Sequence, residues 1–549
     1  MPRLVLGPLL RYVDERRATL WVQTDAPCEV DILGARERTF CVDGQHFALV
    51  VVDGLAPGED HAYTVRLDGE QVWPQTGSEW PASTIRLLDA RRPLDLVFGS
   101  CRTTRPHEPP YALRADEHPD GQGVDALRAY ALRLAAGAAA KPGMLLMLGD
   151  QIYADQPSPA LKAQLAARDD RPPQAPPDEL ADFCDYALAY REAWSEPVIR
   201  WLLSTVPTTT IFDDHEIHAE WRISQGWVDE MEAEPWFDDH IRAGLAAYWV
   251  FQHIGNVPPE DLHAGDLYNK VREAADAGAL LAAAMDTEGR QTGHSRWSFA
   301  RDLGDARLVV IDSRAGRAVR PGARQLIRDE EWDWVREQAT RPARHLLLAS
   351  SVPFLLAPGL HHVEAFDEAL ADGAWAGRAG AWAGEKLRRL AVLDHWASFQ
   401  ATFRRLAEVL DDVAHGRCGD APASIVMLSG DVHHCYLAEV GFREHGTPHS
   451  PVWQAVCSAF RKELAPHERR VIAFGHTPLG ERLARRLARA IGVPPLPLDW
   501  RVVERPAYAN QVGTLRIDGP HAGVSVEAVV DGSWRDPQLR VAFARDLTA

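Results

Sequence analysis

The sequence has few cysteines and no long apolar run. Its seven Cys residues are an odd number and include no CxxC pair, so they do not form a disulfide framework and are typical of a protein from a reducing compartment. No run approaches the roughly 18 apolar residues that a membrane helix needs. The short apolar N-terminal segment is followed by Asp14 and Glu15 and has no cleavage-site pattern. We therefore predict no signal peptide, no membrane span and a cytoplasmic location.

Basic residues are fewer than acidic residues in this sequence. Lys and Arg total 59 against 78 Asp and Glu, which gives a formal net charge of -19. No basic stripe interleaved with aromatic residues is present, so we expect no nucleic-acid partner, although a local cationic pocket stays compatible with this balance. The sequence also has no GxSxG motif that would indicate a serine nucleophile. It does not predict an oligomeric state.

The chain changes character near residue 90. From Leu4 to about Leu88, short alternating β segments are separated by Asp, Gly and Pro, which predicts a fibronectin-like β-sandwich domain over residues 1–90. From Leu94 onward, apolar strands alternate with helical stretches, and the tail from Gly513 alternates again. This pattern predicts an α/β domain over residues 91–549, with added strands at its C-terminus.

One stretch organises the second part of the chain. In MLLMLGDQIYAD, a short apolar run after Pro142 and Gly143 leads directly into Gly149, Asp150 and Tyr153. A buried parallel strand that carries a functional site at its carboxyl end has this form. Many such aspartates only cap the next helix, so this motif alone is weak.

The same pattern recurs four times, which strengthens the interpretation. The runs are LDLVFGS before Cys101-Arg102, PTTTIF before Asp213-Asp214-His215-Glu216, RLVVI before Asp312-Ser313-Arg314, and SIVMLSG before Asp431-Val432-His433-His434. If these strands lie side by side, the residues that follow them share one rim of the sheet.

Such a rim would hold several carboxylates, a thiol and imidazoles, which repel or desolvate one another unless cations bind them. Thiolate and imidazole suit transition metals, carboxylates suit calcium, magnesium or manganese, and iron accepts a tyrosine phenolate. We therefore predict a trivalent iron near Cys101 and Tyr153, a harder divalent ion near the aspartates, and Asp150 as a bridge. The alternatives are an inert buried thiol at Cys101 and a core tyrosine at Tyr153.

The blocks FGSCR, GDQIYAD, FDDHE, DSRAGR and SGDVHH together resemble the PhoD-like alkaline phosphatases, a branch of the metallophosphoesterases, from about Leu94 to Phe460. The resemblance implies a layered αββα core beside the N-terminal sandwich. It also implies a metal-dependent phosphoesterase that hydrolyses phosphate mono- or diesters through a metal-bound hydroxide. A catalytically silent relative that binds a phosphorylated ligand or partner is the alternative.

The resemblance also implies roles for particular residues. The ligands of Fe3+ would be Cys101, Asp150, Tyr153 and His433, and those of Ca2+, with Mn2+ or Mg2+ as alternatives, would be Asp150, Asp214 and Asp431. His215 would protonate the leaving group and Arg314 would face the phosphate. Arg102 either contacts the phosphate or pairs with a neighbouring acid. The roles of Asp213 and His434 stay open.

Three further segments carry expectations. Gln156–Glu179 holds six prolines and is predicted to be a loop, and Trp221–Asp261 is predicted to be an acidic insertion, partly helical. The helix predicted over Glu481–Gly492 has arginines on one face and Leu or Ile on another. It either touches a membrane surface or anionic partner, or docks on the core as an ordinary surface helix.

Overall fold

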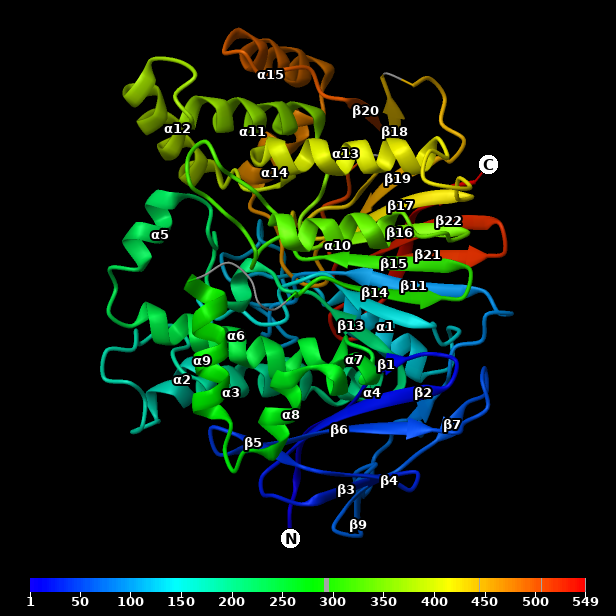
Figure 1. The fold of residues 1–549 in the computed structure, drawn as a ribbon. Coiled ribbons are helices and arrows are strands. Elements are labelled where there is room, and N and C mark those ends of the chain that lie inside the picture. Colours follow the sequence, from blue (N-terminus) through cyan, green and yellow to red (C-terminus); the bar gives the residue numbers. More distant parts are fainter. Residues whose placement is uncertain (291–295, 444, 505, 549) are drawn as a thin grey trace.

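The computed structural model describes residues 1–290, 296–443, 445–504 and 506–548 (Figure 1). Its N-terminal part consists of short antiparallel strands. One sheet has the order β1 (Leu4–Val13), β2 (Arg17–Thr24), β6 (Gln45–Asp53), β5 (Phe40–Val42), and a second has the order β4 (Ala35–Arg38), β3 (Glu29–Ile32), β8 (Val65–Leu67), β9 (Glu70–Trp73). β7 (His61–Ala62) pairs with β10 (Thr84–Ile85). Buried side chains from both four-stranded sheets, such as Leu20, Val30 and Val65, form one apolar cluster.

Two larger sheets form the core. The first has the order β13 (Thr208–Thr210), β12 (Met144–Met147), β11 (Leu94–Gly99), β21 (Gln511–Asp518), β22 (His521–Val529), β23 (Leu539–Asp546). The second has the order β14 (Phe299–Leu303), β15 (Ala306–Ile311), β16 (His345–Ser350), β17 (Ser424–Ser429), β19 (Val452–Val456), β18 (Tyr436–Phe442), β20 (Leu498–Val502). β11, β12 and β13 run parallel, as do β15, β16, β17 and β19.

The two sheets pack face to face because their apolar runs bury both faces. In β12, Leu146 joins a cluster shared with Leu347 and Val426 of the second sheet, whereas Leu145 points to the helices on the other side. Successive strand residues point to opposite faces, so an uninterrupted apolar run belongs to a strand covered on both sides. The predicted mixed α/β architecture is confirmed.

Helices cover both outer faces. Those on the first sheet include α1 (Ala126–Ala135), α3 (Phe183–Trp194), α4 (Pro197–Thr205) and α6 (Phe237–Phe251), and those on the second are α10 (Asp329–Ala339) and α13 (Gln400–Ala414). The remaining helices of the first half are α2 (Pro159–Ala166), α5 (Gln225–Met231), α7 (Pro259–Ala264), α8 (Asp266–Glu273) and α9 (Gly278–Arg290). None of the helices in the described ranges is long and apolar enough to cross a membrane.

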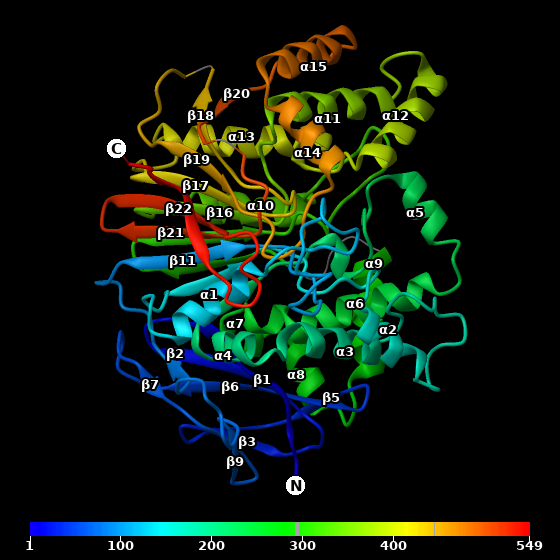
Figure 2. The same ribbon diagram turned by 180° about the vertical axis from the view of Figure 1, so that it is seen from behind.

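The N-terminal strands attach to the helices of the first sheet. The Trp21 indole N–H donates to the carbonyl of Val250 at 2.9 Å, and Trp21 and Phe47 pack against Phe251 of α6. Figure 2 shows this sheet beneath α3 and α4, on the side away from the second core sheet. The N-terminal strands therefore support the helix layer.

The structure revises one segment prediction and agrees with another. Gln156–Glu179 is not only a loop, because α2 forms within it. Ser158 caps α2 by accepting from the Leu161 N–H, and Pro159 takes the first helical position, where its missing N–H costs nothing. Trp221–Asp261 is partly helical as predicted.

Candidate metal centre

The ligand-type side chains predicted at strand ends do converge, although their strands belong to two sheets. β11 and β12 lie in the first sheet and β17 in the second. The Ser100 hydroxyl after β11 accepts from the Asp431 N–H after β17 at 2.9 Å, and the Cys101 N–H donates to the Gly149 carbonyl at 3.2 Å. The shared rim is thus the place where the carboxyl ends of two packed sheets meet.

Two groups of possible metal ligands share one member. Potential ligand atoms of Cys101, Asp150 and His433 all lie within 4.8 Å of one another. A second group on the same criterion is Asp150, Asp213, Asp214 and Asp431. Asp150 therefore stands between a thiol–imidazole pair and a cluster of carboxylates.

The backbone at these residues adopts an unusual conformation. Cys101, Asp150, Asp431 and His433 all have positive φ, at 57°, 52°, 65° and 51°. The left-handed region costs a residue with a side chain about 1–2 kcal/mol, and such strain concentrates at functional sites. Before Asp150, Gly149 has φ 105°, and a Cβ there would lie 2.5 Å from the Cβ of Asp213. The turn that carries Asp150 consequently requires glycine.

Several oxygens of this centre are buried and have no hydrogen-bond partner within the described chain. They are both carboxylate oxygens of Asp150, Oδ2 of Asp213, Oδ1 of Asp214 and the Tyr153 hydroxyl. Buried polar groups are almost always paired, and an unpaired carboxylate is especially costly. These oxygens, together with the neighbouring thiol and imidazole, fit a site that binds cations.

Burial is the largest cause of the pKa shifts of Asp150, Cys101 and His433. Burial, followed by the nearby charges of Asp214, Glu216 and Asp431, raises the pKa of Asp150 well above its usual range. Burial likewise raises the pKa of the Cys101 thiol. For His433, burial and then the positive charge of Lys462 lower the pKa to about 3, which keeps the imidazole neutral, as a ligand must be.

Arg314 lies inside the carboxylate cluster. It is 1% exposed, and its guanidinium contacts Asp213 at 2.5 Å, Asp431 at 3.2 Å and Asp214 at 3.7 Å. It also pairs with Asp394, which binds Arg317 as well. In this arrangement Arg314 acts as a counterion for the candidate ligands.

His215 lies beside the centre and is held from two sides. Its Nδ1 is 2.7 Å from Asp155 Oδ1, and its Nε2 is 3.4 Å from the Lys462 ammonium. The same ammonium lies 4.1 Å from the centre of the Tyr153 ring. The described residues offer Lys462 no carboxylate at ion-pair distance. Sequence reasoning missed Lys462, which follows β19 in FRKE without an acidic or histidine motif.

His395 and Asp394 were missed as well. The His395 Nε2 is 3.3 Å from Asp431 Oδ2, and its Nδ1 is 2.6 Å from Glu364 Oε1. Burial alone would lower the pKa of His395, but Glu364 and the hydrogen bond to Asp431 raise it well above the usual value. Neither residue follows a strand, so the strand-end pattern could not find them.

Glu216 ties two of the ligand loops together. Its carboxylate accepts from the N–H groups of Asp150 at 3.2 Å, Gln151 at 2.7 Å and Asp213 at 2.8 Å. The FDDHE block therefore contributes a structural acid in addition to Asp214 and His215.

Replacing Glu216 with Ala should destabilise the fold. The change leaves three buried N–H groups without an acceptor, and one such group costs about 1–3 kcal/mol. We expect the free energy of unfolding, measured by urea denaturation, to fall by at least about 3 kcal/mol. Glu216→Gln, which keeps one acceptor oxygen, serves as the matched control and should lose less. Equal stability of Glu216→Ala and the wild type would contradict the proposal that Glu216 stabilises the ligand loops.

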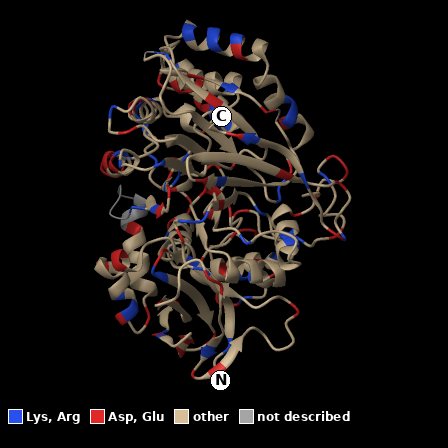
Figure 3. Ribbon diagram, turned by 90° about the vertical axis from the view of Figure 1, so that its right-hand side faces the viewer, with Lys and Arg blue, Asp and Glu red and all other residues tan. Residues whose placement is uncertain are grey.

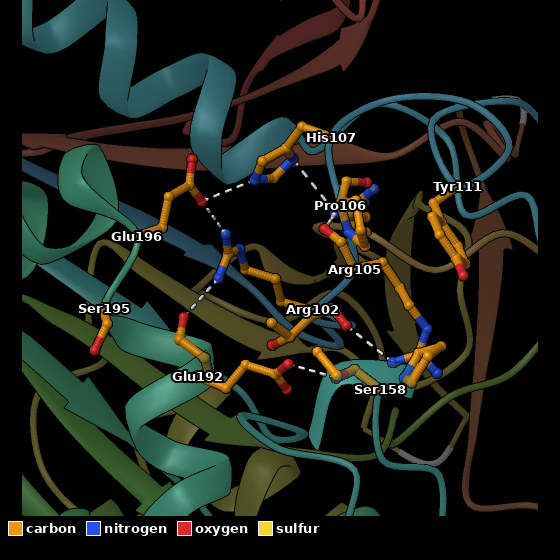
Figure 4. A pocket seen from close by; sticks show the side chains of 14 residues that line it. Arg102, Arg105, Pro106, His107, Tyr111, Ser158, Glu192, Ser195 and Glu196 are labelled. Atoms are coloured by element: carbon orange, nitrogen blue, oxygen red, sulfur yellow. Dashed lines mark hydrogen bonds and ion pairs between the residues drawn. The ribbon is translucent and has the colours of Figure 1, made fainter. Parts of the chain in front are cut away.

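Arg102 is bound by acids. Its guanidinium donates to Asp125 at 2.9 Å and Glu196 at 2.8 Å and to the Ala193 carbonyl at 2.9 Å. Of the two roles left open by the sequence, the structure shows the ion pair. Figure 4 shows Arg102 beside Glu196 in the wall of a cavity of about 550 Å3, into which Arg105 also projects.

His434 points away from the carboxylates. Its Nδ1 lies 2.7 Å from the Val432 carbonyl, and its ring stacks on Tyr436 and Tyr508. Asp213, by contrast, belongs to the carboxylate group. Of the two residues whose roles the sequence left open, Asp213 therefore lies among the candidate metal ligands and His434 lies outside them.

The described core thus brings metal-ligand-type side chains together where two packed sheets meet. Residues 121–471 match the family model described as PhoD-like phosphatase, which is more than half of the chain. The chain belongs to the PhoD-like phosphatase family and is a phosphoester hydrolase. Residues 1–85 match a second model, described as a domain of unknown function, DUF7800.

A solved structure supports this fold. The structure of PhoD is similar, with a TM-score of 0.58 and 13% sequence identity, over 99% of this chain and 92% of that one. The purple acid phosphatase PPD1 from yellow lupin (Lupinus luteus) aligns with a TM-score of 0.44 and 10% identity, over 99% of this chain and 73% of that one. A comparison with curated protein sequences found no significant match.

Proposed function

We propose that the chain hydrolyses phosphate monoesters, diesters or both at a centre of two metal ions. The observation that carries the proposal is the position of Asp150. It belongs to both ligand groups, and both of its carboxylate oxygens are buried without a hydrogen-bond partner in the described chain. A carboxylate with two available oxygens between two sets of ligands is suited to bridge two cations.

The donor types support a different metal on each side. Fe3+ would be held by Cys101, Asp150, Tyr153 and His433, because thiolate, imidazole and phenolate are ligands that iron accepts. Ca2+, or Mn2+ or Mg2+ in its place, would be held by Asp150, Asp214 and Asp431, which offer only oxygens. Asp213 is close enough to add a further oxygen to this side.

Two cations held there would acidify a water for attack on phosphorus and would clamp the phosphoryl oxygens. The protein's part is to move a proton. Asp155 Oδ1 lies 2.7 Å from His215 Nδ1 and orients the ring, so that Nε2 is the atom from which a proton would pass to the departing alkoxide. We assign leaving-group protonation to His215 on this basis.

Lys462 is our candidate for the phosphate-facing cation. Its ammonium is beside His215 Nε2 and Tyr153, and its side chain is partly exposed. Arg314 could face the phosphate, as the family resemblance implies, only if its guanidinium left the carboxylates that surround it. Arg102 would likewise have to leave Asp125 and Glu196.

We further propose that catalysis belongs to residues 91–549 and that residues 1–90 are a separate supporting domain. All the candidate ligands follow strands of the two core sheets. The N-terminal strands contact the helix layer of the first sheet.

The test of the function is hydrolysis of p-nitrophenyl phosphate and bis(p-nitrophenyl) phosphate by protein purified without chelator, with and without added calcium. Turnover of one substrate or both would support the proposal and define which esters the site admits. Absence of turnover with the metals still bound would favour a relative that only binds a phosphorylated ligand.

A further inference from the structure

Exposed apolar side chains are concentrated at one end of the molecule. Nine of the thirteen large exposed apolar residues in the described chain lie within 375–392 and 471–487. These segments belong to α12 (Gly377–Ala391), α14 (Pro466–Gly475) and α15 (Pro478–Ala490), which gather around α11 (Pro358–Ala371) (Figure 1). Isolated exposed apolar residues are ordinary, but a concentration of them marks an interaction site.

The helix α15 is attached to the core by its small residues. Its buried positions are Gly480, Ala484 and Ala488. A Cβ on Gly359 of α11 would lie 3.2 Å from the backbone of Gly480, so the two helices approach closely. α15 is therefore a docked surface helix, as one of the two sequence alternatives expects, and it docks through its small residues.

The leucines of α15 face outward instead. Leu479, Leu483 and Leu487 are 58%, 45% and 55% exposed. A spacing of four residues places them in one line along the helix. On the preceding helix α14, Val471 and Phe474 are 57% and 50% exposed. We call these five side chains the apolar ridge.

Arginines flank the apolar ridge. Arg482, Arg486 and Arg489 are exposed, and no carboxylate of the described residues forms an ion pair with them. Arg485, the remaining arginine of α15, pairs with Glu481 at 3.2 Å. Figure 3 shows several basic positions, in blue, along the helix at the top of the molecule. They form a local positive surface on a chain whose net charge is -19.

We propose that the apolar ridge docks the protein on the surface of a lipid bilayer that carries anionic headgroups. A helix with leucines on one side and arginines beside them lies in the plane of such a surface, with its apolar side chains inserted and its guanidinium groups at the headgroups. The positive charges of the arginines favour an anionic bilayer over a second copy of this chain as the partner of the ridge. A second copy packed symmetrically on the ridge would bring the two sets of arginines together, which is unfavourable without intervening anions.

The test uses the full chain and vesicles in a co-sedimentation assay. Wild-type protein should bind vesicles of equal parts phosphatidylcholine and phosphatidylglycerol at low salt and should not bind phosphatidylcholine alone. One basic residue near an anionic surface changes binding by about 5-fold. The triple variant Arg482→Glu, Arg486→Glu, Arg489→Glu should therefore weaken binding by more than about 100-fold. Binding should also fall as salt rises.

A second variant tests the apolar part. Leu479→Ser, Leu483→Ser, Leu487→Ser should lose at least about tenfold in vesicle binding, while its phosphatase turnover stays at the wild-type level and shows that the fold is intact. The control is Arg540→Glu, Val541→Ser on β23, which exchanges an exposed arginine and an exposed apolar residue elsewhere and should bind like the wild type.

Two results would overturn the proposal. One is a wild-type protein that stays in the supernatant with anionic vesicles at low salt. The other is a dimer in light scattering that the leucine substitutions dissociate, because the ridge would then be an interface between copies of this chain.

Discussion

Asp150→Asn should abolish both metal binding and phosphatase turnover. The residue belongs to both ligand groups, and an amide offers one neutral oxygen in place of two charged ones. Changes that lie behind a metal ligand already cost about 10–100-fold, so loss of a shared ligand should reduce turnover by more than about 100-fold. Metal analysis of the purified variant, by inductively coupled plasma mass spectrometry, should show neither ion at the wild-type level.

The same variant should be at least as stable as the wild type once metals are removed. Without a cation, the Asp150 carboxylate is buried beside other acids, and burial together with these charges raises its pKa. A neutral amide removes that unfavourable charge. In chelator, the thermal midpoint of Asp150→Asn should equal or exceed that of the wild type, and added metal should raise only the wild-type midpoint.

Asp95→Asn provides a matched control, because Asp95 lies on β11 and pairs with Arg516 away from the centre. It should retain metals and turnover. If Asp150→Asn also retained both, Asp150 would not bridge two ions.

His215→Asn should slow turnover according to the leaving group. General acid catalysis contributes about 10²–10⁴-fold when the leaving group needs a proton. We expect kcat to fall by that factor for alkyl phosphate esters, whose alkoxides are strongly basic. The loss should be less than about tenfold for p-nitrophenyl phosphate, because p-nitrophenolate departs without protonation.

The control for this prediction is His218→Asn, three residues further along. His218 contacts the Ala219 carbonyl through its own Nδ1 and packs on Trp227, so it should not transfer this proton. An equal loss for both classes of ester in His215→Asn would contradict leaving-group protonation and would point to a role in shaping the site.

The positions of the candidate ligands were predictable because each follows a β-rich run, and all of these runs except the one at β13 (Thr208–Thr210) are mainly apolar. A pattern of this kind is local: the run MLLM and the glycine after it are enough to place Asp150 at the end of β12. The arrangement of the strands, by contrast, could not be predicted from a local sequence pattern. Asp150 and Asp431 come from different sheets, and only the packing of those sheets, as at the contact between Ser100 and Asp431, brings them together.

The residues that hold the ligands in place were much harder to predict. His395 reaches Asp431 from a segment between α12 and α13, and Lys462 reaches His215 from the connection between β19 and α14. Their contacts depend on tertiary packing and leave no period or motif in the chain. Arg102 shows the same limit, because the acids that bind it, Asp125 and Glu196, are 23 and 94 residues away in sequence.

The exposed leucines of α15 show where periodicity misleads. An amphipathic pattern normally predicts that the apolar side faces the core. Here the glycine and alanine side faces α11, since small residues allow the closer approach of two helices. The hydrophobic pattern identified the helix correctly, but the choice of buried side depended on the shape of its neighbour.

The most direct test of a two-metal phosphoesterase is to measure metal content and turnover together on the wild-type protein. We expect two metal ions per chain, one of them iron, with turnover lost on removal by chelator and restored when iron and calcium are both returned. A protein that keeps full turnover after both ions have been removed would contradict the account.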